Sequence, residues 1–275
     1  MAGPRTCRAV VLGAALVCFA VSQAQTQPAA KPAAPASRAK DWAAIAQLPD
    51  WGGVWRPNIR DQVAQEKDMP WNAVVASQIA QMQKEEAEGR PRFILYGCLP
   101  PGSPSWMLMS HEAMELLFTP GRVTILGDGD GNRLRRIYTD GRGHPEDPDP
   151  TFFGHSIGHW EGQALVIDTT AILPQVQLAV SESVGIPNNG DMHVRERIYL
   201  AKPGELRDDL EITAPKVLSR PYRTTRIWTK QTIPPDLTEA VCQQGMMRPS
   251  KDEHGNDVFK VQKMNELGQP VADDK

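Results

Sequence analysis

The feature that most constrains the fold is a long series of short segments in which apolar and polar residues alternate. Such segments follow one another from Met114 to Thr229, and most are separated by turns rich in glycine, proline or aspartate. In one of them, Val194, Ile198 and Leu200 share one face with Glu196, while arginine and tyrosine occupy the other. A period of two is typical of β-strands, and short turns favour antiparallel pairing. The sequence therefore predicts an antiparallel meander of about eight strands, which loses its unpaired edges if it closes into a barrel.

The predicted strands are Met114–Thr119, Arg122–Leu126, Leu134–Asp140, Ser156–Trp160, Ala164–Thr170, His193–Leu200, Glu205–Thr213 and Tyr222–Thr229. One N-terminal helix is predicted before them, with Pro70 near its first turn and Gly89 as its stop. Its apolar residues recur at helical spacing, so we expect one packed stripe, formed by Val74, Val75, Ile79 and Met82.

The N-terminus has the pattern of a secretory signal peptide over residues 1–24. Arg5 and Arg8 precede an apolar run, and Ser22-Gln23-Ala24 forms a small-residue cleavage site. The run is too short to cross a bilayer, which takes about 20 residues. We therefore expect a periplasmic or secreted protein, with no membrane attachment after cleavage.

The remaining organisation follows from composition. Residues 25–40, rich in alanine and proline, are predicted as a disordered spacer, residues 41–247 as one domain and residues 248–275 as a polar, loosely ordered tail. Cleavage removes two arginines and no acid, so the net charge falls from −3 to −5. An acidic chain of this kind is not expected to bind nucleic acid.

Two cysteines remain after signal cleavage, Cys98 and Cys242. In an oxidising compartment a single pair is expected to form a disulfide. Two buried free thiols are the alternative.

Polar residues with chemical potential gather between Arg136 and Asp168, where three of the six histidines occur. The group is Arg136, Tyr138, Asp140, Arg142, His144, Asp147, Asp149, His155, Ser156, His159 and Asp168. A barrel of about eight strands either fills its interior with side chains or holds one small ligand. We therefore expect this group to line the interior of the barrel or its mouth.

Two stretches of this region resemble a large family of secreted, mostly uncharacterised bacterial proteins. They are Asp140-Gly-Arg-Gly-His-Pro145 and Gly154-His-Ser-Ile-Gly-His-Trp-Glu-Gly-Gln-Ala-Leu-Val-Ile-Asp168. The family pattern is Asp-Gly-Arg-x-His-Pro followed by Ser-x-Gly-x-Trp-Glu-Gly-Asp-x-Leu-Val-Val-Asp-Thr. This chain departs from it at Gln163 and in the stretch after Asp168. The resemblance implies a secreted, mainly β protein and names no reaction. Separately, Gly53-Val-Trp55 is similar to the opening of lipocalin-like barrels.

A metal site is one interpretation of the histidines. His144, His155 and His159 are three nitrogen ligands of the kind that bind catalytic zinc. However, His155 and His159 lie on a predicted strand, where residues four apart are separated by about 13 Å. We therefore predict no metal and keep a zinc-dependent enzyme as an alternative.

Acid–base chemistry is the interpretation that we favour. His144 and His155 are the candidate bases, and Asp140 and Asp168 are the carboxylates that would orient them. A hairpin over residues 154–170 would place His155 opposite Thr169 and so close to Asp168. In a structural interpretation, Asp140 only begins a turn and Asp168 only caps the end of a strand. The candidate substrate-binding residues are Tyr138, Arg142, Ser156, His159 and Trp160.

Motifs of other chemistries are absent from the sequence, including a Gly-x-Ser-x-Gly elbow, a glycine-rich phosphate loop and Cys-x-x-Cys. The favoured hypothesis is a cofactor-independent lyase or isomerase that acts on a small apolar or aromatic molecule in a barrel pocket. The alternative is a periplasmic protein that binds such a molecule without changing it. The sequence does not specify the substrate or the oligomeric state.

Overall fold

The computed structural model of the 275-residue chain describes residues 41–59, 69–92, 94, 99–109, 112–128, 133–181, 183–232 and 247–261. The predicted signal peptide, the spacer and both Cys98 and Cys242 lie outside these residues, so export and the disulfide stay predictions. Across the described part of the chain, no helix has the length and apolar character needed to cross a membrane.

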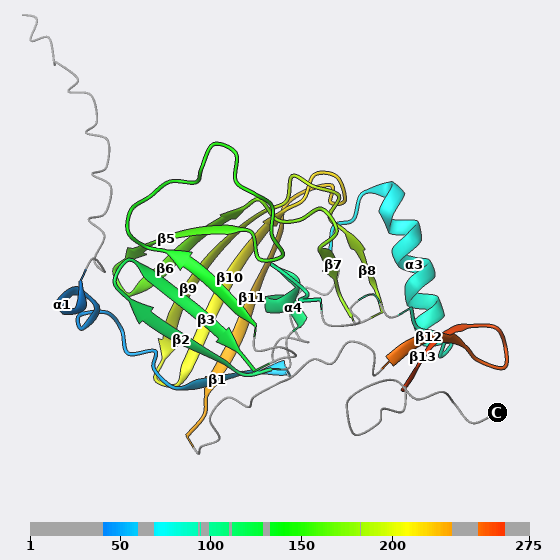
Figure 1. The fold of residues 1–275 in the computed structure, drawn as a ribbon, viewed down its shortest axis with the longest axis horizontal. Coiled ribbons are helices and arrows are strands. Elements are labelled where there is room, and N and C mark those ends of the chain that lie inside the picture. Colours follow the sequence, from blue (N-terminus) through cyan, green and yellow to red (C-terminus); the bar gives the residue numbers. More distant parts are fainter. Residues whose placement is uncertain are drawn as a thin grey trace, which may run out of the picture. The chain divides into compact units, whose positions relative to one another are not determined.

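The fold is mainly β and is built on a closed barrel of nine strands (Figure 1). The order around the barrel is β1-β11-β10-β9-β6-β5-β4-β3-β2, and every neighbouring pair except β4–β5 is antiparallel. The strands are β1 (Val54–Pro57), β2 (Met114–Thr119), β3 (Arg122–Gly127), β4 (Leu134–Tyr138), β5 (His155–Glu161), β6 (Ala164–Thr170), β9 (His193–Lys202), β10 (Glu205–Thr213) and β11 (Tyr222–Lys230).

The predicted mainly β barrel is therefore confirmed, with nine strands where about eight were expected. The additional strand is β1, which has four residues and is too short to be recognised from alternation. It closes the barrel because Trp55 pairs with Met114 of β2 on one side and with Lys230 of β11 on the other.

The parallel pair β4–β5 determines the path of the loop that joins these two strands. Ile137 pairs with Ser156, and Tyr138 pairs with Ile157, so the end of β4 lies beside the start of β5. Residues 139–154 therefore leave the barrel at the end of β4 and return to it on the neighbouring strand, at the start of β5. The return is tight at Gly154, whose φ is 69° and where a Cβ atom would lie 2.5 Å from the carbonyl oxygen of Thr170.

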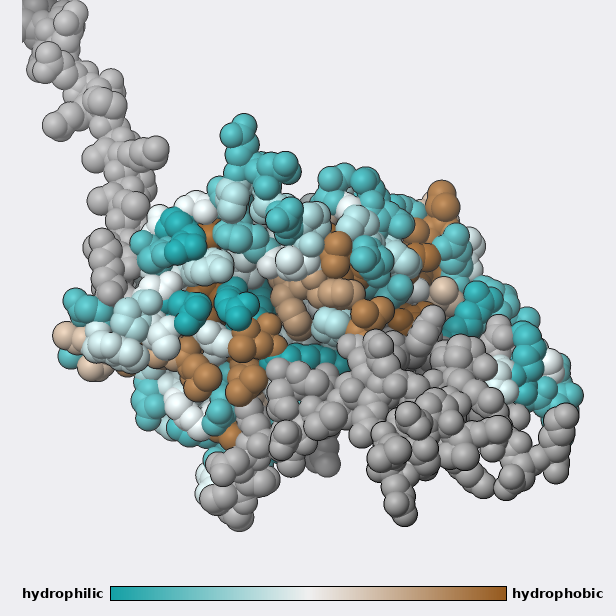
Figure 2. Space-filling model, viewed as in Figure 1, coloured by the Kyte–Doolittle hydropathy of each residue, from teal (hydrophilic) through white to brown (hydrophobic). Residues whose placement is uncertain are grey.

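Several contacts hold the far end of this β4–β5 loop. The Thr151 amide donates to the Ala171 carbonyl at 3.0 Å, and the Thr151 carbonyl accepts from the Leu173 amide at 2.9 Å. Phe153 packs edge-on against Trp106, with ring centroids 5.5 Å apart. The loop is thus tied to the segment that follows β6 and to the barrel core. Figure 2 shows hydrophilic residues at the top of the view, where this loop crosses in Figure 1.

Large aromatic side chains form much of the barrel core. Trp51, Trp55, Trp106, Trp160 and Trp228 are all buried in one hydrophobic cluster. Trp160 packs against Trp51 and Phe118, with ring centroids 5.2 and 5.6 Å apart. Trp160 was predicted to bind substrate, but its inward position on β5 places the indole in the core, 3% exposed.

A second hydrophobic cluster lies around the predicted helix, which is α3 (Ala73–Ala87). The helix begins after Asn72, whose side chain accepts from the Val75 amide at 3.0 Å. Val75 and Ile79 are buried as expected, but Val74 is 73% exposed, because neighbouring helical residues point about 100° apart.

Smaller elements complete the described structure. They are α1 (Trp42–Ile45), α4 (Ser105–Met109), the pair β7 (Gln177–Ala179) and β8 (Gly185–Pro187), and the hairpin of β12 (Met247–Lys251) and β13 (Asp257–Val261). The last hairpin falls within the segment that was expected to be a loosely ordered tail.

A network of charged and polar side chains is buried inside the barrel. The Arg135 guanidinium donates through both terminal nitrogens to the carboxylate of Glu196, and to the Thr169 hydroxyl at 2.9 Å. Ser156 lies 3.2 Å from the same guanidinium and 2.8 Å from the Thr169 hydroxyl. Ser156 was predicted to bind substrate, but the structure places its side chain inside the barrel, 1% exposed.

Asp208 is the unusual member of this network. No described donor reaches either of its carboxyl oxygens, although the residue is almost completely buried. Burial raises the pKa of Asp208 well above its usual range, and the neighbouring Glu196 carboxylate raises it further, while Arg135 opposes the shift. A protonated Asp208 that donates to Glu196 accounts for the lack of a donor to its carboxyl oxygens and for its raised pKa.

This protonation predicts how stability depends on pH. An unfolded aspartate has a pKa of about 3.9, so between that pH and the raised pKa of the folded state the folded protein binds up to one more proton than the unfolded chain. The free energy of unfolding should then fall as pH rises, by at most about 1.4 kcal/mol per pH unit. Asp208→Asn keeps a donor towards Glu196 and does not titrate, so it should remove this decrease and stabilise the protein at neutral pH. Urea unfolding of both proteins between about pH 5 and pH 8 measures the effect. Two parallel stability curves would contradict the assignment.

Candidate functional site

The predicted hairpin over residues 154–170 is present as β5 and β6, with a register that differs by one residue from the expected one. His155 pairs with Thr170, and Ile157 pairs with Asp168. The connection is a two-residue turn between Glu161 and Ala164, which shifts the pairing. Since side chains alternate across a strand, this register puts His155 and Asp168 on the same face.

That face is the outer surface of the barrel. Ser156 and Trp160 alternate with His155 and His159 along β5 and point into the core. The polar group was expected to line the interior of the barrel or its mouth, but the side chains of His155 and Asp168 lie on the outer face of the barrel wall. Along β6 the buried Leu165 and Ile167 alternate with Asp168, so the alternation itself indicates that Asp168 faces away from the core.

His144 connects the two residues. Its Nε2 atom lies 2.9 Å from Asp168 Oδ1, and its Nδ1 atom lies 2.8 Å from His155 Nδ1. The Thr170 hydroxyl is a further neighbour, 3.3 Å from His144 Nδ1. The expectation that Asp168 holds His155 directly is replaced by an indirect link, because the β4–β5 loop inserts His144 between them.

His193, at the start of β9, is a member of the site that sequence reasoning missed. Its Nε2 atom lies 2.9 Å from the same Asp168 Oδ1 atom that His144 contacts. Arg195, two residues further along β9, approaches Asp168 Oδ2 at 3.4 Å. The sequence does indicate that His193 shares one face of its strand with Arg195 and Arg197, because the three residues are spaced by two. Only the pairing of β6 with β9 brings that face to Asp168.

The hydrogen bonds specify which ring nitrogens carry protons. Asp168 has a lowered pKa and is a carboxylate, so it accepts hydrogen from Nε2 of both His144 and His193. A neutral His144 then has a lone pair on Nδ1, which accepts from Nδ1–H of His155. When His155 and His193 are neutral as well, His155 Nε2 and His193 Nδ1 each carry a lone pair, and no hydrogen bond from a described residue reaches either atom. These protons are inferred from the hydrogen-bond network.

Two pKa shifts agree with this assignment. Burial would raise the pKa of Asp168, but the hydrogen bonds from His193 and His144 outweigh it and lower the pKa. The pKa of His155 is lowered from 6.5, mainly by burial and further by the charges of His144 and Arg142. The side chains of His144, Asp168 and His193 are 21%, 32% and 30% exposed, so the chain is shielded but within reach of a small molecule.

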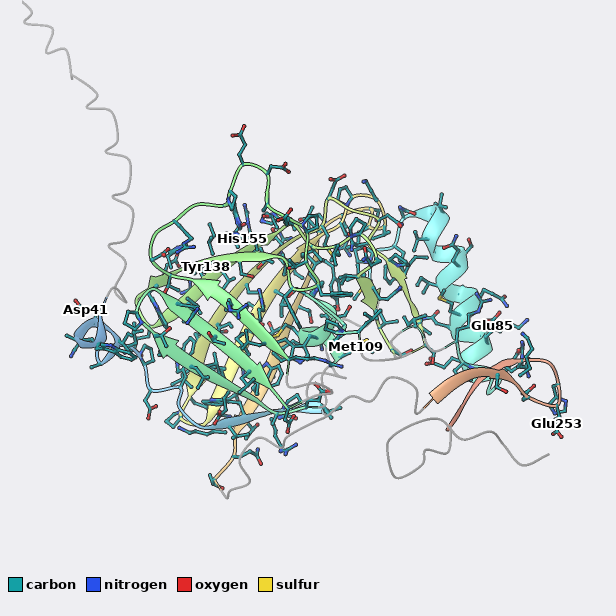
Figure 3. All side chains as sticks on the ribbon, in the orientation of Figure 1. Asp41, Glu85, Met109, Tyr138, His155 and Glu253 are labelled. Atoms are coloured by element: carbon teal, nitrogen blue, oxygen red, sulfur yellow. The ribbon has the colours of Figure 1, made fainter. Side chains whose placement is uncertain are left out.

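Aromatic and cationic groups cover one side of His155. The Tyr138 ring stacks on the His155 ring with centroids 5.4 Å apart, and the Arg142 guanidinium lies 4.2 Å from the centre of the Tyr138 ring. Figure 3 labels Tyr138 and His155, which come from the neighbouring strands β4 and β5. Asp140 does not contact a histidine: it pairs with Arg142, at 2.6 Å between Oδ2 and Nη2. The predicted orienting role of Asp140 is therefore replaced by a contact that holds Arg142 beside Tyr138.

His159 lies on the same outer face of β5 but outside the chain of hydrogen bonds. Its Nε2 atom is 3.3 Å from Glu161 Oε1, and its side chain is 45% exposed. Within the described ranges, no three histidine, cysteine, aspartate or glutamate side chains are placed so that they could hold a metal ion.

The outer face continues from Asp168 into a hollow over β6, β9, β10 and β11 with a volume of about 590 Å³. Arg195 belongs to both regions, since it contacts Asp168 and lines the hollow. Comparison with known proteins adds no identity to this geometry: no protein family matches the chain, and no curated protein matches it.

Proposed function

We propose that this protein is a cofactor-independent enzyme, a lyase or an isomerase, that moves a proton on a small organic molecule bound at the outer face of β5, β6 and β9. The observation that carries the proposal is the connected chain His155–His144–Asp168–His193, in which the end nitrogens, His155 Nε2 and His193 Nδ1, have no hydrogen-bond partner among the described residues. The reaction class is the one that the sequence predicts, and the site lies outside the barrel and not in an internal pocket.

In the first step, His155 Nε2 removes a proton from a carbon atom of the substrate. The proton becomes part of an imidazolium, and the electron pair of the broken C–H bond stays on the substrate as an enolate or a related anion. Asp168 supports the positive charge through His144, and Arg142 beside Tyr138 is placed near the negative charge.

In the second step, a proton returns to the substrate. Asp168 is a single carboxylate and is also contacted by Arg195, so it favours one imidazolium in the chain and disfavours a second. The proton that His155 Nε2 has taken is the only one that the chain has gained, so the His155 imidazolium is the acid of this step and His193 Nδ1 keeps its lone pair. Return of the proton to another carbon gives isomerisation, and its delivery to a departing group gives elimination.

Proton exchange with heavy water tests the proposal and does not require the product to be identified. The protein is incubated in D₂O with a panel of small carbonyl compounds and carboxylic acids, and the mass of each compound is followed. We expect at least one compound to gain deuterium with wild-type protein and not with His155→Gln. If compounds stabilise the protein thermally but none exchanges a proton, the alternative of a non-catalytic binding protein is supported.

Removal of metal should leave the activity unchanged. Asp168 Oδ1 lies 2.9 Å from both imidazole nitrogens, a hydrogen-bond distance, and His159 is engaged with Glu161. We therefore expect elemental analysis of the purified protein to find less than one zinc per chain, and prolonged EDTA treatment to leave the exchange rate constant. One tightly held zinc per chain, lost together with activity, would support the zinc-dependent alternative.

A further inference from the structure

We infer that the hollow beside Asp168 binds the carboxylate group of the substrate, so that the substrates are small organic acids. The bound acid is a substrate only if the proposed function is correct, so in that respect the inference rests on it. Binding of the carboxylate in the hollow does not depend on turnover. Its basis is the arrangement of three arginines on the outer faces of β9 and β11.

Opposite charges alternate across four strands at this place. Asp168 of β6 pairs with Arg195 of β9, Arg195 with Glu211 of β10, and Glu211 with Arg223 of β11. The adjacent row contains Arg197, which pairs with Asp209, and these residues line the same hollow. A volume of about 590 Å³ is within the range of about 300 to 1,000 Å³ that is typical of small-molecule sites.

Each arginine is held by one acid and keeps most of its donors open. Arg195 contacts Asp168 through Nε, Arg197 contacts Glu161 through Nη1 at 2.5 Å, and Arg223 contacts Glu211 through Nη2. A guanidinium has five N–H donors, and no described side chain takes up the remaining nitrogens of Arg195 and Arg197.

The acids of the hollow are already engaged. Glu161 accepts from Arg197 and lies beside His159, and Asp209 accepts from the Thr225 hydroxyl at 2.6 Å. Glu211 pairs with Arg223. The lining thus offers more open donors than open acceptors, which favours an anion. A carboxylate matches the fork of a guanidinium with both of its oxygens.

The position of Arg195 sets the length of such a substrate. His193 lies two residues away on the same face of β9, a separation of about 7 Å along a strand. A carboxylate on Arg195 therefore leaves the carbon atoms a few bonds away within reach of the His193 imidazole. His155, the base of the proposed first step, lies on β5, on the far side of β6 from His193. A substrate that engages both Arg195 and His155 therefore has to extend past His193.

Binding of matched acids and amides tests the inference. Phenylacetate and benzoate are titrated into wild-type protein by calorimetry or NMR, and phenylacetamide and benzamide serve as neutral controls of the same shape. We expect the acids to bind at least about tenfold more tightly than the amides, the effect of one charged hydrogen-bonded pair. Equal affinity of acid and amide, or failure of both acids to bind, overturns the inference.

Variants locate the binding. Arg195→Gln and Arg197→Gln should each weaken phenylacetate binding about tenfold or more, and Arg197 tests the hollow without touching Asp168. Arg136→Gln, on the exposed side of β4, is the matched control and should not change it. Unchanged affinity in both hollow variants contradicts the inference. His155→Gln should still bind phenylacetate, because the variant leaves the arginines of the hollow in place. If wild-type protein binds phenylacetate but exchanges no proton on any compound of the panel, the proposed function is rejected and this inference stands.

Discussion

Replacement of His155 by glutamine is expected to lower the rate of proton exchange by a factor of about 10² to 10⁴, the usual contribution of a general base. The variant lacks the nitrogen that forms the open end of the chain, while Tyr138 and His144 can still pack around the new side chain. Asp168→Asn should have an effect of similar size, because an amide also donates hydrogen and no longer specifies the protonated nitrogens of His144 and His193.

His159→Gln is the control for both variants. It changes a histidine on the same face of β5 that pairs with Glu161 and does not belong to the chain. We expect this variant to keep the wild-type exchange rate, and circular dichroism to show that all three variants are folded. A His155→Gln protein that exchanges protons at the wild-type rate would refute the assigned base.

The pH dependence gives a second measure of the same residue. His155 acts as a base only when it is neutral, and burial together with the charges of His144 and Arg142 lowers its pKa from 6.5. The value of kcat/KM should therefore rise with pH along a limb whose apparent pKa lies below 6.5. The same shift makes a small contribution to stability, which is present above pH 6.5 and is lost as pH falls through the lower, folded-state pKa.

Replacement of Arg135 by methionine is expected to destabilise the protein by about 3 to 5 kcal/mol, the usual cost of removing one partner of a buried ion pair. Arg135 and Glu196 are almost completely buried, so the variant leaves the Glu196 carboxylate without its counterion beside Asp208. Urea unfolding measures the difference.

The adjacent residue provides the control. Arg136 lies on the exposed side of β4, and Arg136→Met should change the free energy of unfolding by less than about 0.5 kcal/mol. Adding Glu196→Gln to Arg135→Met should recover part of the lost stability, because it removes the unpaired charge. Similar effects of Arg135→Met and Arg136→Met would show that the interior network does not stabilise the barrel.

The sequence predicts the strands well because alternation reports directly on burial. It identifies eight of the nine barrel strands and the β5–β6 hairpin, and it fails at β1, where four residues hold too little pattern. The parallel pairing of β4 with β5 was also missed. Nothing in a run of apolar and polar residues tells whether the next strand returns or continues in the same direction.

The candidate site was predicted in part. His144, His155 and Asp168 do come together, because they are near in sequence and the hairpin restricts their positions. His193 and Arg195 were missed because they reach Asp168 only through the pairing of β6 with β9, which no local pattern specifies. Arg135, Glu196 and Asp208 were missed for a related reason. A charged residue at an inward position looks like an irregularity in the alternation until its partners from other strands are known.

The β4–β5 loop supplies His144 to the candidate site but contributes no strand to the barrel, so the site and the barrel can change independently in evolution. Its two ends meet on neighbouring strands, so a change in the exposed part of the loop around His144 does not alter the pairing of β4 with β5, provided that the contacts of Thr151, Phe153 and Gly154 are kept. A descendant protein could thus inherit His155, Asp168 and His193 on the scaffold and exchange only the segment that supplies His144. Grafting this segment from one relative to another is accordingly the shortest route by which evolution, or an engineer, would change what the surface acts upon.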